Sequence, residues 1–350
     1  MRAEASGPTA NRSEPTSRVA REGSQRPAAT RRVEAPGQKE KRQEQISGVA
    51  REGTHLPSAG GRRETLVAYL LLSPVIILFL IFIAGPLLGA IALSFFAWDL
   101  FSDPVFVGLE NYRTLLDDTT SRKAITNTLV FGFWSLVLHV VGALLLALAV
   151  QRTMPAVLRY LFRTAVFFPV IMSWASVALI WNFILDPNFG FINYYLEQFG
   201  VPTESWLLSP TWAMPAIILV DLWKTIGFTF IIILAGLQGV PGHLYDAAKV
   251  DGANTWQRFV DVTLPMLSPT LFLVAIITFI GAFQIFEPMF IMTGGGPLDS
   301  TISIVQHIYE TGFRRFEMGY AATLALVVFV VIMIVTLVQM LIGRYWVFYE

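Results

Sequence analysis

Six long apolar segments constrain what this chain can fold into. Each has about the 20 predominantly apolar residues that a helix needs to cross a bilayer. An isolated strand cannot satisfy its backbone in lipid, and barrel strands are about 10 residues long with alternating polarity. We therefore predict an all-α integral membrane protein with six transmembrane helices. These lie near Leu66–Phe96, Ala124–Val150, Thr164–Ile184, Trp212–Leu237, Leu267–Met292 and Met318–Ile342.

The distribution of charge agrees with a membrane location. Charged residues make up 14% of the chain, whereas a soluble domain has about 25%. Residues 1–64 hold 13 of the 25 Lys and Arg, so the rest is poorer still in basic side chains. The same 64 residues contain no apolar run, which predicts a disordered basic tail and not a signal peptide. Residues 65–350 then form the transmembrane domain.

Basic residues in the loops predict the orientation, because cytoplasmic loops are enriched in Lys and Arg. The tail is basic, and the second loop, Gln151–Arg163, contains three arginines. The third loop contains no Lys or Arg. We therefore expect both termini to be cytoplasmic.

The residue inventory excludes several kinds of chemistry. The sequence has no cysteine, which excludes disulfides, thiol catalysis and thiolate metal sites, and its four histidines are scattered. One of them, His139, is expected to be satisfied by a neighbouring helix. No acid–base constellation indicates a membrane enzyme, and no filter sequence indicates a channel. The phosphate-binding pattern Gly-x-x-x-x-Gly-Lys-Ser/Thr is missing too, so we expect no nucleotide site in this chain.

The fourth loop, residues 239–266, is long for a connection between two membrane helices. Its first half is rich in Ala and Leu, which favours a helix, and Gly252 permits a sharp turn. A second short helix is expected to follow and to end at Pro265, which cannot continue it. The sequence therefore predicts a helix–turn–helix hairpin outside the membrane.

This hairpin resembles the EAA signature of ABC importer permeases. In that pattern an acid and two alanines are followed by a glycine and, further on, by Ile-x-Leu-Pro. Asp246 replaces the usual Glu and Val262 the usual Ile. The resemblance, closest to carbohydrate-uptake permeases of the maltose and glycerol-phosphate type, extends over most of residues 66–350. The residues of the hairpin that would couple to an ATPase are Asp246, Ala247, Ala248, Asp251, Gly252, Leu264 and Pro265.

The resemblance implies the six-helix fold of a type I ABC importer permease in the bacterial cytoplasmic membrane. Its hairpin would be a coupling helix seated in a cytoplasmic ATPase dimer, which would hold ATP and Mg. The chain itself would bind no cofactor and would be no enzyme. The other implied partners are a second permease subunit in a heterodimer, an extracytoplasmic solute-binding protein, membrane lipid and a sugar or related polyol as solute. No nucleic acid is implied.

Ionisable residues at membrane depth indicate the solute path, because they are costly unless they face a cavity or a partner. Asp221 and Lys224 lie three residues apart, hence on one face of the fourth segment, and Glu287 lies in the fifth. Two interpretations stay open: a buried Asp221–Lys224 ion pair that fixes helix packing, or a face that lines the path. Alignment with the maltose permease places sugar-contacting positions at Asp221, Thr225, Phe228 and Gln284.

An ion-coupled secondary transporter is the alternative function. Asp221 and Glu287 could then carry the coupling ion. Such transporters are usually built from inverted repeats, and none is detectable here. The hairpin favours the importer, since only an ABC permease needs a docking element for a separate ATPase.

Overall fold

The computed structural model describes residues 62–151 and 155–348. All but the last three residues of the predicted tail, 1–64, lie outside these ranges, as does Arg152 of the second loop. The chain divides into two units, 1–74 and 75–350. The described part of the first unit is the start of α2, Arg62–Phe79. Everything described below belongs to the second unit, apart from the first apolar span.

Helices account for nearly all regular structure in the second unit. After α2 the chain continues through a π-helical turn, η1 (Leu80–Ala84), into α3 (Gly85–Leu93). Two short strands, β1 (Phe96–Ala97) and β2 (Val105–Phe106), pair antiparallel with Phe96 opposite Phe106. The remaining elements are α4 (Glu110–Asp117), α5 (Thr119–Gln151), α6 (Ala156–Ile171), α7 (Trp174–Ile184), α8 (Phe191–Gln198), α9 (Ala213–Gly239), α10 (Gly242–Val250), α11 (Thr255–Arg258), η2 (Phe259–Thr263), α12 (Leu264–Phe283), α13 (Glu287–Met292), α14 (Ile304–Tyr309), η3 (Glu310–Arg314) and α15 (Met318–Trp346).

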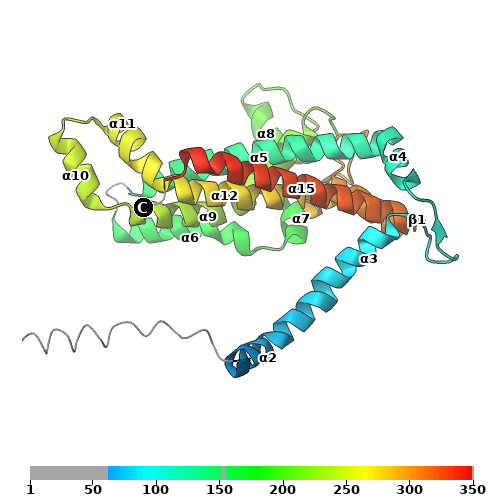
Figure 1. The fold of residues 1–350 in the computed structure, drawn as a ribbon. Coiled ribbons are helices and arrows are strands. Elements are labelled where there is room, and N and C mark those ends of the chain that lie inside the picture. The colour runs from blue at the N-terminus through cyan, green and yellow to red at the C-terminus, as the bar shows by residue number, and fades with distance from the viewer. Residues whose placement is uncertain (1–61, 152–154, 349–350) are drawn as a thin grey trace, which may run out of the picture. The chain divides into compact units, whose positions relative to one another are not determined.

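Four long helices, α5, α9, α12 and α15, lie alongside one another (Figure 1). The α10–α11 hairpin and the C-terminal end of α15 lie at one end of this group, and α4 and β1 lie at the other (Figure 1). The hairpin and the end of α15 are therefore on the same side of the helical bundle.

The described residues contain five helices that are long and apolar enough to cross a membrane, with a sixth crossing if the bent pair α6 and α7 forms one span. The prediction of an all-α protein with six apolar spans is thus confirmed. The single-helix spans are Thr65–Leu93, Thr119–Gln151, Ala213–Gly239, Thr255–Phe283 and Met318–Trp346.

The third predicted span, Thr164–Ile184, is wrong as a single helix. The helices α6 and α7 meet at an angle of 102°. Pro169 removes a backbone donor near the end of α6. Ser173 then caps α7, its Oγ accepting a hydrogen bond of 3.2 Å from the N–H of Ser176. Because nearly every residue here is apolar, the hydropathy pattern did not reveal this break.

The fifth predicted span, Leu267–Met292, is also divided. Its helix α12 ends at Phe283, and a separate helix, α13, begins at Glu287. Pro288 lies in the first turn of α13, a position that suits proline because the N–H it lacks would have no partner there.

The helix before Pro265 does not end there, contrary to the prediction. The N–H of Leu264 bonds to the carbonyl of Phe259, five residues back, so η2 is a π-helical turn. Pro265 then falls in the first turn of α12, where a missing N–H is tolerated. One continuous helical segment therefore runs from Thr255 to Phe283.

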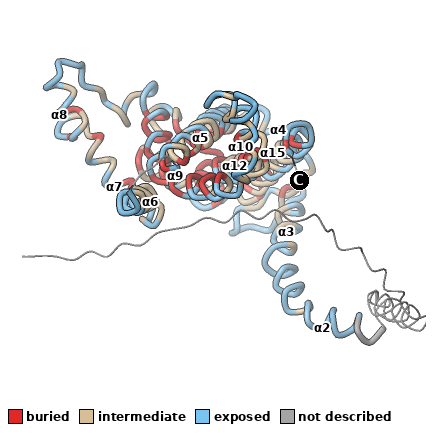
Figure 2. The backbone as a smooth tube through the Cα atoms, turned by 90° about the vertical axis from the view of Figure 1, so that its left-hand side faces the viewer, coloured by how far each residue is buried: buried red, intermediate tan, exposed pale blue. Residues whose placement is uncertain are grey.

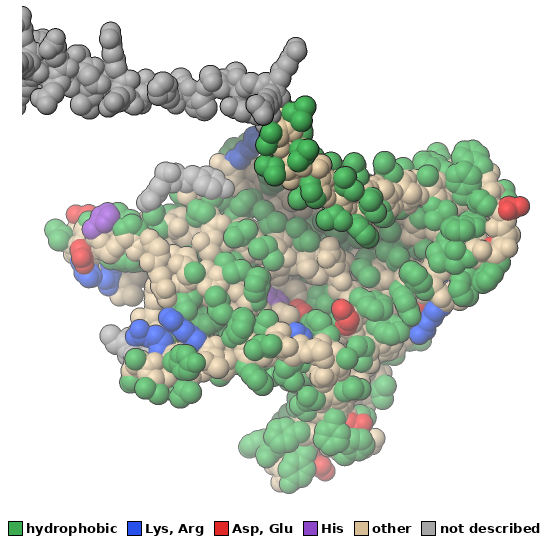
Figure 3. Space-filling model, turned by 90° about the horizontal axis from the view of Figure 1, so that it is seen from below, with side chains coloured by type: hydrophobic (Ala, Val, Ile, Leu, Met, Phe, Trp, Pro, Cys, Tyr) green, Lys and Arg blue, Asp and Glu red, His purple; other side chains and the backbone are tan. Residues whose placement is uncertain are grey.

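The core is built around α9. In its most apolar window 56% of the residues are buried, against 33% or less in the other single-helix spans. Buried residues gather where α9 faces α5 and α12 (Figure 2). The face seen in Figure 3 has many hydrophobic and few charged side chains, as expected for helices solvated by lipid.

Gly227 lets α6 and α9 approach closely. A Cβ at this position would collide with the carbonyl oxygen of Val166 and lie 2.9 Å from the Cα of Phe167. Both atoms belong to the α6 backbone, which cannot move aside as the end of a side chain can.

We predict that Gly227→Ala destabilises the protein by about 2–4 kcal/mol, because it forces α6 away from α9. Gly239→Ala at the end of α9 is the matched control, since no atom lies within 4 Å of its added Cβ. Thermal unfolding in detergent measures both. Equal midpoints for the two variants would contradict the close packing of α6 on α9.

Candidate functional site

A cavity of about 430 Å³ lies among α5, α6, α7, α9, α12 and α13. Both helix breaks border it: Val170 and Trp174 lie at the first break, and Gln284 and Glu287 at the second. Non-helical backbone at membrane depth is tolerated where it is covered by protein or lines a cavity. The two breaks and the cavity are therefore one structural feature.

The cavity brings together most of the residues predicted for the solute path. Lys224 is not among its lining residues. The predicted residues that line the cavity are Asp221, Thr225, Phe228, Gln284 and Glu287. These come from α9, from the segment between α12 and α13, and from α13 itself.

Lys224 does not form the ion pair with Asp221 that the sequence left open. No salt bridge within the described residues joins it to a carboxylate. Its Nζ donates to the carbonyl of Val170 at 3.4 Å and lies 4.9 Å from the centroid of the Trp174 ring. The carbonyl of Val170 is free because α6 ends one residue later, and a cation is favourable at a helix C-terminus.

Asp221 is held instead by α5. The hydroxyl of Ser135 donates to Asp221 Oδ2 at 3.1 Å, and His139 Nε2 lies 3.9 Å from the same oxygen. His139 Nδ1 lies 2.7 Å from the carbonyl of Ser135, and Nε2 lies 2.6 Å from Thr225 Oγ1. Because a carbonyl only accepts, Nδ1 carries a hydrogen.

Sequence reasoning did not place Ser135, His139 or Trp174 at this cavity, among other lining residues. His139 is hydrogen-bonded to a neighbouring helix, as expected, but it also lines the cavity. A signal was present, since Ser135 and His139 on α5 have the same four-residue spacing as Asp221 and Thr225 on α9. Such pairs on two helices can meet across one interface.

The predicted hairpin forms from α10 and α11. Gly252 has a φ of +80°, a conformation that side chains rarely adopt, and so supplies the turn. Asn254 and Gln257 form a capping box that starts α11. The hydroxyl of Tyr245 lies 3.0 Å from Thr263 Oγ1 and ties α10 to η2.

The outer surface of the hairpin is left uncovered by the residues that the structure describes. Asp246 and Ala247 on α10 are exposed, as are Val250 and Trp256 at 89% and 70%. A hydrogen bond from Lys249 Nζ, 2.9 Å long, and the charge of that lysine lower the pKa of Asp246. Leu264 and Pro265 lie further back, where α12 begins. An exposed apolar patch with a charged neighbour is typical of a protein-interaction surface.

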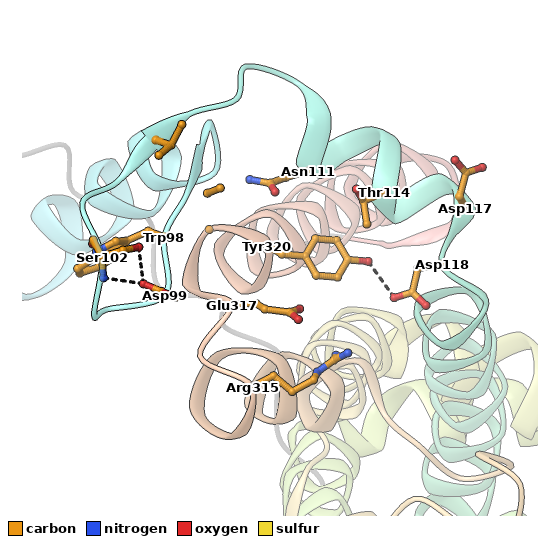
Figure 4. Close-up of a pocket in the computed structure, with 13 residues that line it drawn as sticks. Trp98, Asp99, Ser102, Asn111, Thr114, Asp117, Asp118, Arg315, Glu317 and Tyr320 are labelled. Carbon is orange, nitrogen blue, oxygen red and sulfur yellow. Dashed lines mark hydrogen bonds between the residues drawn. The ribbon is translucent and has the colours of Figure 1, made fainter.

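A second cavity, of about 840 Å³, lies at the opposite end, between α4 and the start of α15. Asp118 lines this cavity and accepts a hydrogen bond from the hydroxyl of Tyr320 (Figure 4). Asp118 Oδ2 accepts hydrogen bonds from Ser121 Oγ at 2.6 Å, from Tyr320 OH at 2.9 Å and from His307 Nε2 at 3.2 Å. This network joins α5, α14 and α15, and sequence analysis did not predict it.

Comparison with known proteins decides the family. The family model described as "binding-protein-dependent transport system inner membrane component" matches residues 139–345. The chain belongs to this family. The resemblance inferred from the fourth loop is thereby confirmed, and the permease is a multi-pass component of the bacterial inner membrane. It is a membrane-spanning subunit of an ABC importer and not the ATPase, which is a separate subunit.

Individual relatives agree with this assignment. The probable ABC transporter permease protein YurN of Bacillus subtilis (strain 168) is 34% identical over 79% of the permease and 96% of its own length. The sulfoquinovosyl glycerol transport system permease protein SmoG of Agrobacterium fabrum (strain C58 / ATCC 33970) is 35% identical over 80% and 91%.

A solved structure supports the type I importer permease fold. It is that of a bacterial ABC transporter involved in the import of the acidic polysaccharide alginate. A chain of that transporter is 28% identical to the permease, with a TM-score of 0.71, over 81% of the permease and 96% of its own length.

We predict that Asp118→Ala destabilises the permease by about 2–3 kcal/mol, because the backbone N–H of Thr120 and the side chains of Ser121, His307 and Tyr320 lose this acceptor. Asp117→Ala, which changes the exposed neighbouring carboxylate, should have little effect. Thermal unfolding at neutral pH measures both variants. Equal effects of the two substitutions would contradict the role of the Asp118 network.

The same network gives a pH dependence. Burial opposes ionisation of Asp118, but hydrogen bonds from Ser121 and Tyr320 outweigh it and lower its pKa from 3.8 to about 2. A depressed pKa contributes stability that is complete above about pH 4 and is lost as the pH falls towards 2. The difference in thermal stability between wild type and Asp118→Ala should therefore become smaller as the pH falls from about 4 towards 2.

Proposed function

We propose that the permease translocates a sugar or related polyol and that the 430 Å³ cavity is part of its solute path. The observation that carries the proposal is the meeting of two helix breaks at one cavity that also holds buried polar groups. Helix breaks and carboxylates are both costly at membrane depth, so their coincidence favours a functional cavity over a packing defect.

The chemistry of the lining suits a carbohydrate. Phe228 and Trp174 offer aromatic faces on which a sugar ring can stack. Asp221, Gln284 and Glu287 offer acceptors for hydroxyl groups, and the Gln284 amide also donates. Two relatives named above support the class, since one is named for sulfoquinovosyl glycerol and the other for alginate.

The α10–α11 hairpin is proposed to dock on an ATPase dimer that holds ATP and Mg. Asp246 would pair with a basic group there, and the small side chains of Ala247 and Ala248 would allow close approach. The continuous helical segment from Thr255 to Phe283 joins the hairpin directly to the break that borders the cavity. A displacement of the hairpin by the ATPase would therefore move one wall of the solute path.

Further partners complete the proposed importer. A second permease subunit, in a heterodimer, would supply the other half of the path. An extracytoplasmic binding protein would deliver the solute, in keeping with the family description. Both termini would be cytoplasmic. For the C-terminal side this agrees with the hairpin and the end of α15 lying at the same end of the bundle (Figure 1).

We predict that Phe228→Ala lowers sugar uptake by proteoliposomes about tenfold or more, because stacking area is lost from the cavity. Phe133→Ala is the matched control, since Phe133 is a similarly exposed phenylalanine, of α5, that does not line the cavity. Co-purification with the ATPase should be unchanged in both. Equal uptake by the two variants would mean that this cavity is not part of the solute path.

We predict that Asp246→Lys and Gly252→Ala reduce co-purification with the ATPase subunit several-fold. The first reverses a charge at the exposed face, and the second strains the turn at a φ of +80°. Glu197→Lys, at an exposed site on α8, is the charge-matched control. Full ATPase recovery with both hairpin variants would mean that the hairpin is not the docking element.

A further inference from the structure

The cavity of the proposed solute path presents two carboxylates and no cation. Asp221 and Glu287 line it, and no Lys or Arg does so among the described residues. Its other polar side chains are hydroxyls, one amide, the indole of Trp174 and the imidazole of His139. The charge that a solute would meet in this part of the path is therefore negative.

The basic side chain of Lys224, on α9, already has partners within the protein. Lys224 is 6% exposed, and its ammonium group is covered by the Trp174 ring and the carbonyl of Val170. To reach a solute it would have to leave the C-terminal end of α6, which would lose its cap. Lys224 can therefore reduce the negative potential of the cavity, but it does not line the cavity and does not reach a solute there.

The side chain of His139 also has its partners within the protein. Both ring nitrogens are within hydrogen-bond distance of protein atoms, Nδ1 of the Ser135 carbonyl and Nε2 of the Thr225 hydroxyl. His139 is 3% exposed, whereas Glu287 is exposed and has no salt bridge or hydrogen bond within the described residues. The group most available to a solute is thus the Glu287 carboxylate, whose charge is felt by Lys224 but which forms no salt bridge with it.

We infer that the permease carries carbohydrates that have no anionic group, and that Glu287 is a specificity-determining residue that excludes acidic ones. This inference rests on the proposed solute path. Two like charges about 5–7 Å apart in a protein interior repel strongly enough to weaken binding by roughly tenfold or more. The permease would differ in this respect from both relatives cited for the solute class, since alginate is an acidic polysaccharide and sulfoquinovosyl glycerol carries a sulfonate.

The test is equilibrium binding to the assembled importer in detergent. The binding protein is omitted, because it makes its own selection of solutes. The probes are two neutral trisaccharides, maltotriose and arabinotriose, and the acidic trigalacturonate, each titrated to millimolar concentration and followed by calorimetry. The variants are Glu287→Gln, which removes the charge but keeps the shape, and Glu197→Gln as the exposed control on α8.

The expected result is that at least one neutral trisaccharide binds about tenfold or more tightly than trigalacturonate. Glu287→Gln should narrow that ratio about tenfold by strengthening trigalacturonate binding, while Glu197→Gln leaves it unchanged. Wild-type binding of trigalacturonate that equals or exceeds neutral binding overturns the inference, as does a ratio that Glu287→Gln does not alter. Absence of binding by all three probes instead contradicts the proposed solute path and, with it, this inference.

Discussion

Lipid offers no hydrogen-bond partner, so every polar group at membrane depth in this chain depends on another part of the protein. Asp221 shows the consequence, because its carboxylate oxygen is held by Ser135 and lies near His139, both on α5. Thr225, one turn along α9, reaches the same histidine. These contacts fix the register of α5 against α9, the pair of helices that forms the centre of the bundle.

The same constraint explains where the helices break. Ending α6 at Ile171 frees backbone carbonyls, and Lys224 satisfies one of them. Ending α12 at Phe283 places Gln284 and Glu287 at the cavity. A break that faced only lipid would leave such groups unpaired, and both breaks instead border the cavity. The two helix breaks therefore meet Asp221 and Glu287 at the cavity of the proposed solute path.

Much of this could be predicted from the sequence, and the exceptions have physical causes. The six apolar segments and the turn at Gly252 depend on local composition, which the sequence contains in full. The breaks were missed because a continuously apolar run has no period to interrupt, although Pro169 and Pro288 stood at both places. The partner of Lys224 could not be predicted, since the carbonyl of Val170 becomes available only once α6 has ended. Spacing placed Asp221 and Lys224 on one helix face, but what faces each of them depends on tertiary packing.

The central claim is that the cavity between α5, α9 and the α12–α13 break belongs to the solute path. The most direct measurement is a structure of the assembled importer, with both permease subunits and the ATPase, in the presence of a transported oligosaccharide. The account predicts solute density against Phe228, within hydrogen-bond distance of Asp221, Gln284 or Glu287. Solute resolved elsewhere, with this cavity filled by side chains of the second permease subunit, would contradict it.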